Sequence, residues 1–271
     1  MSGLPRPPRL PGLVATDLDG TLVRSDGTVS DYTRHVLDEL DVRGVPVVFV
    51  TGRPLRWAVD VFQYVGGHGL AVVSNGALVW DVARSAIHLH RPIDPGLGLE
   101  VCRLIRAAVP GSGFAVETVE GIGLEPEFLE RHVVPDGSRR GPIDEIFDRP
   151  AVKLLARHEE LPPQEFWDAA EAAVGDRVTI TWSSSTSLLE ISAAGVTKAS
   201  TLALLCADLG VEAADVIAFG DMPNDLPMLG WAGTSYAMAD AHPTVTEAAD
   251  HVAPGHDDDG VARVLAGVFD L

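Results

Sequence analysis

Short apolar runs that end abruptly in polar residues constrain the fold of this 271-residue chain more than any other feature. Four such runs, at residues 13–17, 45–50, 70–73 and 215–219, carry few polar interruptions. Runs of this kind are typical of strands covered on both faces, as in parallel sheets. A helical apolar period follows the first run, at residues 31–43. The order of strands and helices predicts an α/β fold, with a Rossmann-like, doubly wound parallel sheet.

The middle of the chain has a different pattern. Two short strands within residues 77–90, a helix near 98–109 and further short strands are mixed without a strand–helix rhythm. Such mixing is typical of an α+β module. We therefore predict a core made of residues 1–80 and 190–271, with an α+β domain inserted at 81–189.

Charge excludes some classes of partner. The chain has 39 acidic and 20 basic residues, and the formal net charge of −19 repels nucleic acid and anionic membrane surfaces. No apolar run approaches the length needed to cross a bilayer. We expect a monomer or a small homo-oligomer that binds a small metabolite, with neither nucleic acid nor membrane as a partner.

Two features predict a cytoplasmic location. Cys102 and Cys206 each lie in an apolar helical pattern, which predicts buried, reduced thiols. Residues 1–12 lack the continuous apolar stretch of a signal peptide, and their prolines predict a short disordered lead.

The residues that follow the predicted strands form a chemically coherent set. Ligands of open parallel sheets bind outside the carboxyl ends of the strands, so these segments are expected to meet in one crevice. Asp17 at a strand end can attack phosphorus and form an aspartyl phosphate. Asp19, two residues on and facing the same side, can protonate the leaving oxygen and then activate water. Gly20 then allows a tight turn beside the substrate.

Two carboxylates beside a phosphate require cations. Mg²⁺ prefers hard oxygen ligands and commonly takes one or two protein carboxylates together with phosphate and water, which predicts Asp17 and Asp221 as ligands. Lys198 adds a fixed positive charge. The hydroxyl of Thr51 and the backbone amide of Gly52, just before a helix, can hold phosphate oxygens.

Six motifs together resemble those of the haloacid dehalogenase superfamily, and within it the Cof-type phosphatases with a large C2-type cap. They stand in the family's order along almost the whole chain: DLDGT at 17–21, TGR at 51–53, SNGA at 74–77, GVTK at 195–198, GDMPND at 220–225 and HDDDGVA at 256–262.

The resemblance implies roles for the acidic residues. Asp17 corresponds to the nucleophile and Asp19 to the acid/base, which also contributes to the metal through its backbone carbonyl. Asp221 corresponds to a further Mg²⁺ ligand, and Asp225 to an acid that supports the site from behind.

The resemblance also implies the phosphate-binding residues and the reaction. Thr51 and Lys198 correspond to phosphate ligands, and Asn224 to an asparagine on the phosphate side. The expected function is Mg²⁺-dependent hydrolysis of a small phosphate monoester, such as a sugar phosphate or a similar metabolite. The inserted domain at 81–189 corresponds to the family's cap domain, which is expected to select the substrate.

Two other functions stay open. A phosphomutase of the phosphomannomutase type would keep the same aspartates, although TGRP at 51–54 differs from the Gly-Gly-Ser-Asp-like segment of those enzymes. A non-catalytic metabolite-binding protein could keep the fold, although the intact acidic residues and Lys198 argue against it.

Two polar segments have competing interpretations. Ser74-Asn75-Gly76 is equally consistent with a hairpin turn and with a substrate contact. The acidic run at 256–259 directly precedes an apolar helical pattern, which favours helix N-capping over a second metal site.

Overall fold

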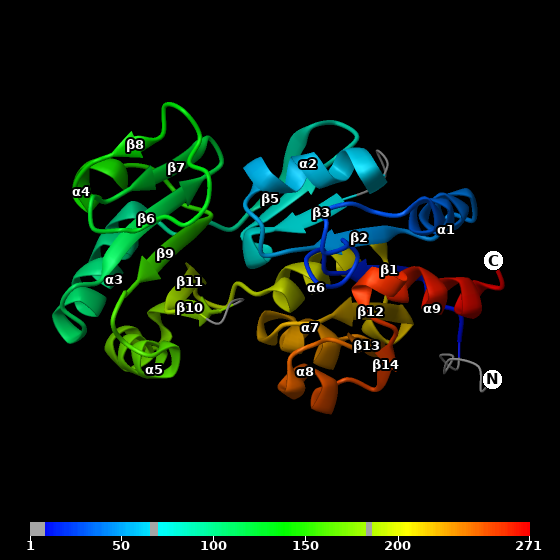
Figure 1. Ribbon diagram of the computed structural model, residues 1–271. Coiled ribbons are helices and arrows are strands. Elements are labelled where there is room, and N and C mark those ends of the chain that lie inside the picture. Colours follow the sequence, from blue (N-terminus) through cyan, green and yellow to red (C-terminus); the bar gives the residue numbers. More distant parts are fainter. Residues whose placement is uncertain (1–8, 66–69, 183–185) are drawn as a thin grey trace. The chain divides into compact units, whose positions relative to one another are not determined.

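The computed structural model describes residues 9–65, 70–182 and 186–271, so residues 1–8 of the predicted lead lie outside the described residues. The chain divides into two compact units, one formed by Met1–Leu89 and Thr197–Leu271 and the other by His90–Val196 (Figure 1). Each unit has a sheet of its own, and the two are described in turn.

The first unit is built on an eight-stranded sheet with the order β14-β13-β12-β1-β2-β3-β4-β5. The strands are β1 (Leu13–Thr16), β2 (Val47–Val50), β3 (Leu70–Val73), β4 (Leu78–Asp81), β5 (Ala86–His90), β12 (Val216–Gly220), β13 (Thr234–Met238) and β14 (His251–Ala253). The pairs from β14 to β3 are parallel, and β4 runs antiparallel to β3. The predicted doubly wound parallel sheet is confirmed, and its strand order reverses at β1.

Helices cover both faces of this sheet. They are α1 (Asp31–Val42), α2 (Leu55–Val65), α6 (Lys198–Leu209), α7 (Leu226–Trp231), α8 (Pro243–Ala248) and α9 (Gly260–Phe269). Ala15 of β1 and Leu202 of α6 belong to one apolar cluster. Phe49 of β2 stacks on Phe62 of α2, with 6.3 Å between the ring centroids. Because Phe49 alternates with Val48 and Val50, which join the cluster with α6, helix α2 covers the opposite face.

The second unit contains a six-stranded sheet with the order β10-β11-β9-β6-β7-β8 (Figure 1). The strands are β6 (Gly113–Thr118), β7 (Gly121–Leu124), β8 (Arg139–Arg140), β9 (Lys153–Arg157), β10 (Val178–Thr181) and β11 (Leu188–Ala193), and the helices are α3 (Pro95–Ala108), α4 (Ile143–Ile146) and α5 (Pro163–Val174). An apolar cluster packs this sheet against α3 and α5, through residues such as Ile105, Leu154 and Phe166. The unit is an α+β module inserted in the first unit.

The unit boundaries differ from the sequence-based ones at 80/81 and 189/190. The β4–β5 hairpin continues the sheet of the first unit, so that unit extends to Leu89. The whole of β11 pairs with β9 and β10, so the second unit extends to Val196. Local strand patterns did not reveal which sheet each of these strands joins.

The two cysteines are buried, as their apolar patterns predict. Cys102 and Cys206 are both buried free cysteines. Among the described residues, no helix combines the length and the hydropathy that a membrane span needs.

Candidate active site

Strand β1 delivers two acidic residues with very different surroundings. Asp17 follows β1 directly, its backbone N–H donates to the carbonyl oxygen of Phe219 at 3.0 Å, and it is buried. Leu18 turns into the core and is fully buried. The side chain of Asp19 is 57% exposed. Asp17 and Asp19 thus lie at the same edge of the sheet, but Asp17 is buried and Asp19 is exposed.

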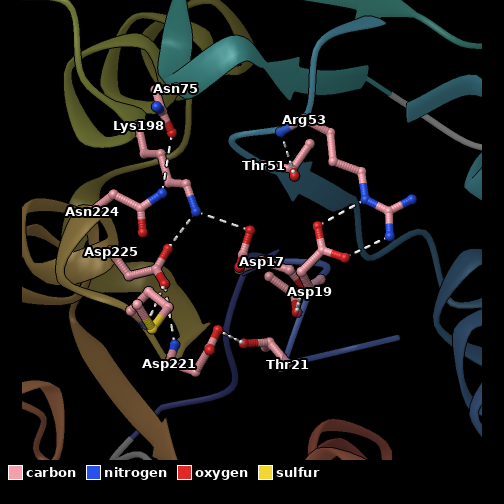
Figure 2. A network of polar contacts seen from close by, with 12 residues as sticks. Asp17, Asp19, Thr21, Thr51, Arg53, Asn75, Lys198, Asp221, Asn224 and Asp225 are labelled. Atoms are coloured by element: carbon pink, nitrogen blue, oxygen red, sulfur yellow. Dashed lines mark hydrogen bonds and ion pairs between the residues drawn. The ribbon is translucent and has the colours of Figure 1, made fainter. Parts of the chain in front are cut away.

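Lys198 is held at the first turn of α6. The side chain of Thr197 accepts a hydrogen bond from the backbone N–H of Ser200, and the side chain of Ser200 accepts one from Thr197 in return. This capping box begins the helix at Lys198. The ammonium of Lys198 lies 2.9 Å from Oδ1 of Asp17 and 2.7 Å from Oδ1 of Asp225 (Figure 2).

The buried cluster contains three acids, Asp17, Asp221 and Asp225, and one base, Lys198. Burial raises the pKa of Asp17 well above its usual range, and the positive charge of Lys198 only partly opposes this. For Lys198, burial alone would lower the pKa, but the charges of Asp17 and Asp225 outweigh burial and raise it. The lysine therefore stays charged, and the carboxylates around it repel one another.

Asp225 supports the loop that carries Asp221. Its Oδ2 accepts hydrogen bonds from the backbone N–H groups of Asp221 and Met222, both at 3.1 Å, while its Oδ1 faces Lys198. The side chain of Asp225 is fully buried. Because both of its carboxylate oxygens accept hydrogen bonds, Asp225 holds this loop in place.

Asp221 lies against the turn that follows Asp19. Oδ1 of Asp221 accepts a hydrogen bond from the hydroxyl of Thr21 at 2.8 Å. At Gly20, φ is +72° and a Cβ would lie 2.4 Å from Oδ2 of Asp221, so any other residue would strain the backbone and displace the Asp221 carboxylate. Burial, reinforced by the charge of Asp225, raises the pKa of Asp221 to about 6.

The donor set fits a divalent cation. Carboxylate oxygens of Asp17, Asp221 and Asp225 lie within 4.8 Å of one another. Within the described residues, Oδ2 of Asp17 and Oδ2 of Asp221 accept no hydrogen bond. Two open carboxylate oxygens in a cluster with surplus negative charge suit Mg²⁺, which favours hard oxygen ligands. Asp17 and Asp221 are thus the side chains that could hold the ion.

The segment after β2 lies beside these acids. Thr51 is buried, and its hydroxyl oxygen accepts a hydrogen bond from the backbone N–H of Arg53 at 3.0 Å. The guanidinium of Arg53 reaches Asp19, with Nε 2.7 Å from Oδ2 (Figure 2). No role was predicted for Arg53. Its signal was the TGR motif itself, which follows a strand adjacent to β1.

The Ser74-Asn75-Gly76 segment both turns the chain and contacts the site. It forms the 3₁₀ turn between β3 and β4, and Oδ1 of Asn75 accepts a hydrogen bond from Nδ2 of Asn224 at 3.1 Å. At Gly52, a Cβ would lie 3.0 Å from Oδ1 of Asn75. The segment thus forms the turn and also places Asn75 beside Gly52 and Asn224. A role in the turn and a contact with substrate are therefore compatible.

The N-capping role predicted for the acidic run 256–259 is confirmed in position only. Asp259 is the N-cap residue of α9, and its backbone carbonyl accepts a hydrogen bond from the N–H of Arg263 at 2.9 Å, but its side chain makes no capping hydrogen bond. Instead it accepts hydrogen bonds from Nη2 of Arg24 at 3.0 Å and from the hydroxyl of Thr33 at 3.2 Å. Asp257 accepts hydrogen bonds from the backbone and hydroxyl of Ser25. Donors from residues 24–33 compete successfully for these carboxylates, so the run anchors the segment that follows Thr21.

Comparison with known proteins places this geometry in context. A family model described as haloacid dehalogenase-like hydrolase matches residues 14–265. The chain is 29% identical to the 5-amino-6-(5-phospho-D-ribitylamino)uracil phosphatase YitU of Bacillus subtilis (strain 168), over 96% of this chain and 98% of that protein. It is 26% identical to the HMP-PP phosphatase of Enterobacter sp. (strain 638), over 89% of this chain and 88% of that protein.

Solved structures of related proteins have the same fold. TM0651 from Thermotoga maritima superposes with a TM-score of 0.76 at 26% identity, covering 95% of this chain and 97% of that one. BT1666 from Bacteroides thetaiotaomicron, a phosphatase of the same superfamily, has a TM-score of 0.80 at 22% identity and covers both chains completely, which supports the fold alone.

Proposed function

The chain belongs to the haloacid dehalogenase-like hydrolases and is an enzyme of this family's phosphatase type, and from this premise we propose that it is a Mg²⁺-dependent phosphatase that forms an aspartyl phosphate on Asp17. One observation carries the proposal. Asp17 is buried and held at Oδ1 by Lys198, while its Oδ2 accepts no hydrogen bond from the described residues. A fixed carboxylate with one open oxygen is suited to nucleophilic attack.

The proposed first step transfers the phosphoryl group to the protein. An oxygen of Asp17 forms a bond to phosphorus as the bond to the leaving oxygen breaks, and Asp19 gives its proton to that oxygen. In the second step Asp19 takes a proton from water, the water oxygen attacks phosphorus, and the bond to Asp17 breaks. Inorganic phosphate leaves, and both acids return to their starting state.

The other site residues position the phosphate. Lys198 supplies positive charge, and Thr51, Gly52 and Asn224 are proposed to hold phosphate oxygens. Mg²⁺, bound by Asp17, Asp221 and the backbone carbonyl of Asp19, would neutralise the charge that develops on the phosphoryl oxygens. Asp225 keeps the loop of Asp221 in place.

The proposed substrate is a small phosphate monoester, such as a sugar phosphate or a similar metabolite. The names of the related phosphatases support this class, because YitU is named for a phosphorylated ribityl compound. We propose that the second unit, His90–Val196, selects the leaving group, and that the protein works in the cytoplasm, where buried free thiols stay reduced.

Release of inorganic phosphate tests the function. The wild-type protein is assayed with Mg²⁺ against 4-nitrophenyl phosphate and a panel of phosphorylated metabolites, beside Asp17→Asn and Asp136→Asn. Asp17→Asn is expected to abolish turnover, because an amide cannot serve as the nucleophile. Asp136 is an exposed acid of the second unit, so its variant should retain activity. Full activity of Asp17→Asn would refute the mechanism, and conversion of a phosphosugar to its isomer without release of phosphate would indicate a mutase.

A further inference from the structure

Arg53 contacts the carboxylate of Asp19 at two points. Nε of Arg53 lies 2.7 Å from Oδ2 of Asp19, and Nη2 lies 2.5 Å from Oδ1 (Figure 2). A guanidinium that meets a carboxylate through two parallel hydrogen bonds fixes its orientation as well as its distance. The contact therefore selects one orientation for the Asp19 side chain.

Asp19 is the exposed acid of the site, and its carboxylate is held by Arg53. Its side chain is 57% exposed, whereas Asp17 is buried against Lys198. Among the described residues, Arg53 is the only side chain that forms a hydrogen bond with the Asp19 carboxylate. Without it, an exposed carboxylate would be distributed over several side-chain rotamers.

Arg53 is itself firmly anchored. Its backbone N–H donates to the hydroxyl of Thr51 at 3.0 Å, and its carbonyl oxygen accepts a hydrogen bond from the backbone N–H of Ser74 at 2.9 Å. Its Nη1 lies 3.5 Å from the carbonyl oxygen of Trp57. Because its backbone N–H and carbonyl oxygen are both hydrogen-bonded, Arg53 can hold the Asp19 side chain in a fixed position.

We propose that Arg53 is the positioning residue of Asp19 in proton transfer, an inference that rests on the proposed function. In the first step one Asp19 oxygen carries the proton and gives it to the leaving oxygen as the phosphorus–oxygen bond breaks. Arg53 keeps its hydrogen bond to the other oxygen. In the second step the same contact aims Asp19 at the attacking water. Arg53 thus acts through Asp19, without touching the reacting atoms.

The basicity of the leaving group separates this role from direct phosphate binding. Phenyl phosphate and 4-nitrophenyl phosphate present the same phosphoryl group, but the phenyl leaving oxygen is the more basic and depends more on a proton donor. A residue that binds phosphate would affect both substrates equally. A residue that positions the proton donor affects phenyl phosphate more.

The first measurement compares kcat/KM of the wild type, Arg53→Ala and Arg53→Lys with both substrates, because kcat/KM reports the transfer to Asp17 and not the later hydrolysis, which is the same for both. Because general acid catalysis contributes about 10²–10⁴-fold, Arg53→Ala is expected to lower kcat/KM about 100-fold with phenyl phosphate and less than about tenfold with 4-nitrophenyl phosphate. Arg53→Lys should restore part of kcat/KM. Arg84→Ala is the control, since Arg84 is an exposed arginine of the same unit that also pairs with an aspartate, Asp81.

The second measurement removes Asp19 first. In an Asp19→Asn background, the further change Arg53→Ala is expected to alter kcat by less than about twofold, because coupled residues are not additive. Equal losses with both substrates, or an undiminished loss in the Asp19→Asn background, would overturn the proposal. Failure of the proposed function would look different, because wild-type protein would then release no phosphate or Asp17→Asn would stay active.

Discussion

The ammonium of Lys198 lies 2.9 Å from Oδ1 of Asp17, and the same nitrogen lies 2.7 Å from Oδ1 of Asp225. One buried ammonium therefore pairs with two buried carboxylates. Lys198 is thus expected to stabilise the fold as well as to take part in the chemistry of the site. Removing the cation leaves two acids in a desolvated environment, where unpaired charge is strongly unfavourable.

Lys198→Met is expected to lose activity and also stability. Loss of one partner from a buried ion pair costs about 3–5 kcal/mol, which predicts an unfolding midpoint in urea clearly below that of the wild type. Adding Asp17→Asn should recover part of the loss, because it removes one of the stranded carboxylates. An unchanged midpoint for Lys198→Met would contradict the assignment of a buried charged cluster.

Mg²⁺ is expected to stabilise the protein against heat. The open oxygens of Asp17 and Asp221 belong to the folded state, so an ion at about 100 times its dissociation constant would add about 2.7 kcal/mol to the free energy of unfolding. Calorimetry with Mg²⁺ and with a chelator measures this effect. Asp221→Asn should lose most of the Mg²⁺-dependent shift in Tm, and Asp136→Asn should keep it. If the Mg²⁺-dependent shift in Tm persists in Asp221→Asn, the ion binds at a site that does not include Asp221.

Gly20 and Gly27 form a matched pair for testing the turn beside Asp221. Both have positive φ, +72° and +81°, but a Cβ on Gly27 would have no heavy atom within 4 Å. Alanine should cost about 1–2 kcal/mol at either position through left-handed backbone strain. Only Gly20→Ala should also impair phosphate release and the Mg²⁺-dependent rise in Tm, because its methyl group displaces the Asp221 carboxylate. Equal activity of the two variants would exclude this steric role.

Two cations on β9 should respond in opposite ways to the same substitution. Nζ of Lys153 lies 3.0 Å from Oε1 of Glu190. Arg157 is also buried, but within the described residues its Nε and Nη1 have no hydrogen-bond partner. Lys153→Met should cost about 3–5 kcal/mol by stranding a buried acid, whereas Arg157→Met should be neutral or stabilising. Calorimetric unfolding compares them, and a larger loss for Arg157→Met would show that its guanidinium is paired in solution.

The apolar patterns predicted those helices and strands whose own sequences are strongly apolar. The helix predicted at residues 31–43 is α1 (Asp31–Val42), and the runs before Asp17 and Thr51 form buried parallel strands. Strand β13 and the short β14 were missed. The sequence of β13, TSYAM, begins with two hydroxyl residues and is not a continuous apolar run, although all five residues are buried and the strand pairs with β12.

The candidate site was predictable only where a single motif carries the chemistry. DLDGT and GDMPND point to acids by themselves. The pairing of Arg53 with Asp19 depends on the parallel register of β1 and β2, which aligns Thr16 with Phe49. In the same way, the carboxylates of 257–259 were available to Arg24 and Ser25 only because distant segments fold against each other. Local propensity contains no information about these partners.

The position of β1 has a consequence for the order of folding. One of its neighbours, β2, is only about thirty residues away in the sequence, but the other, β12, is almost two hundred residues further on. A nascent chain that has not yet emerged beyond Val216 therefore has β1 as an exposed sheet edge, a kind of edge that is prone to wrong pairing. We expect a fragment ending at residue 215 to be cleaved by proteases near β1, and the full chain to resist. Synthesis of the last fifth of the protein would then be the step that closes the sheet around the nucleophile.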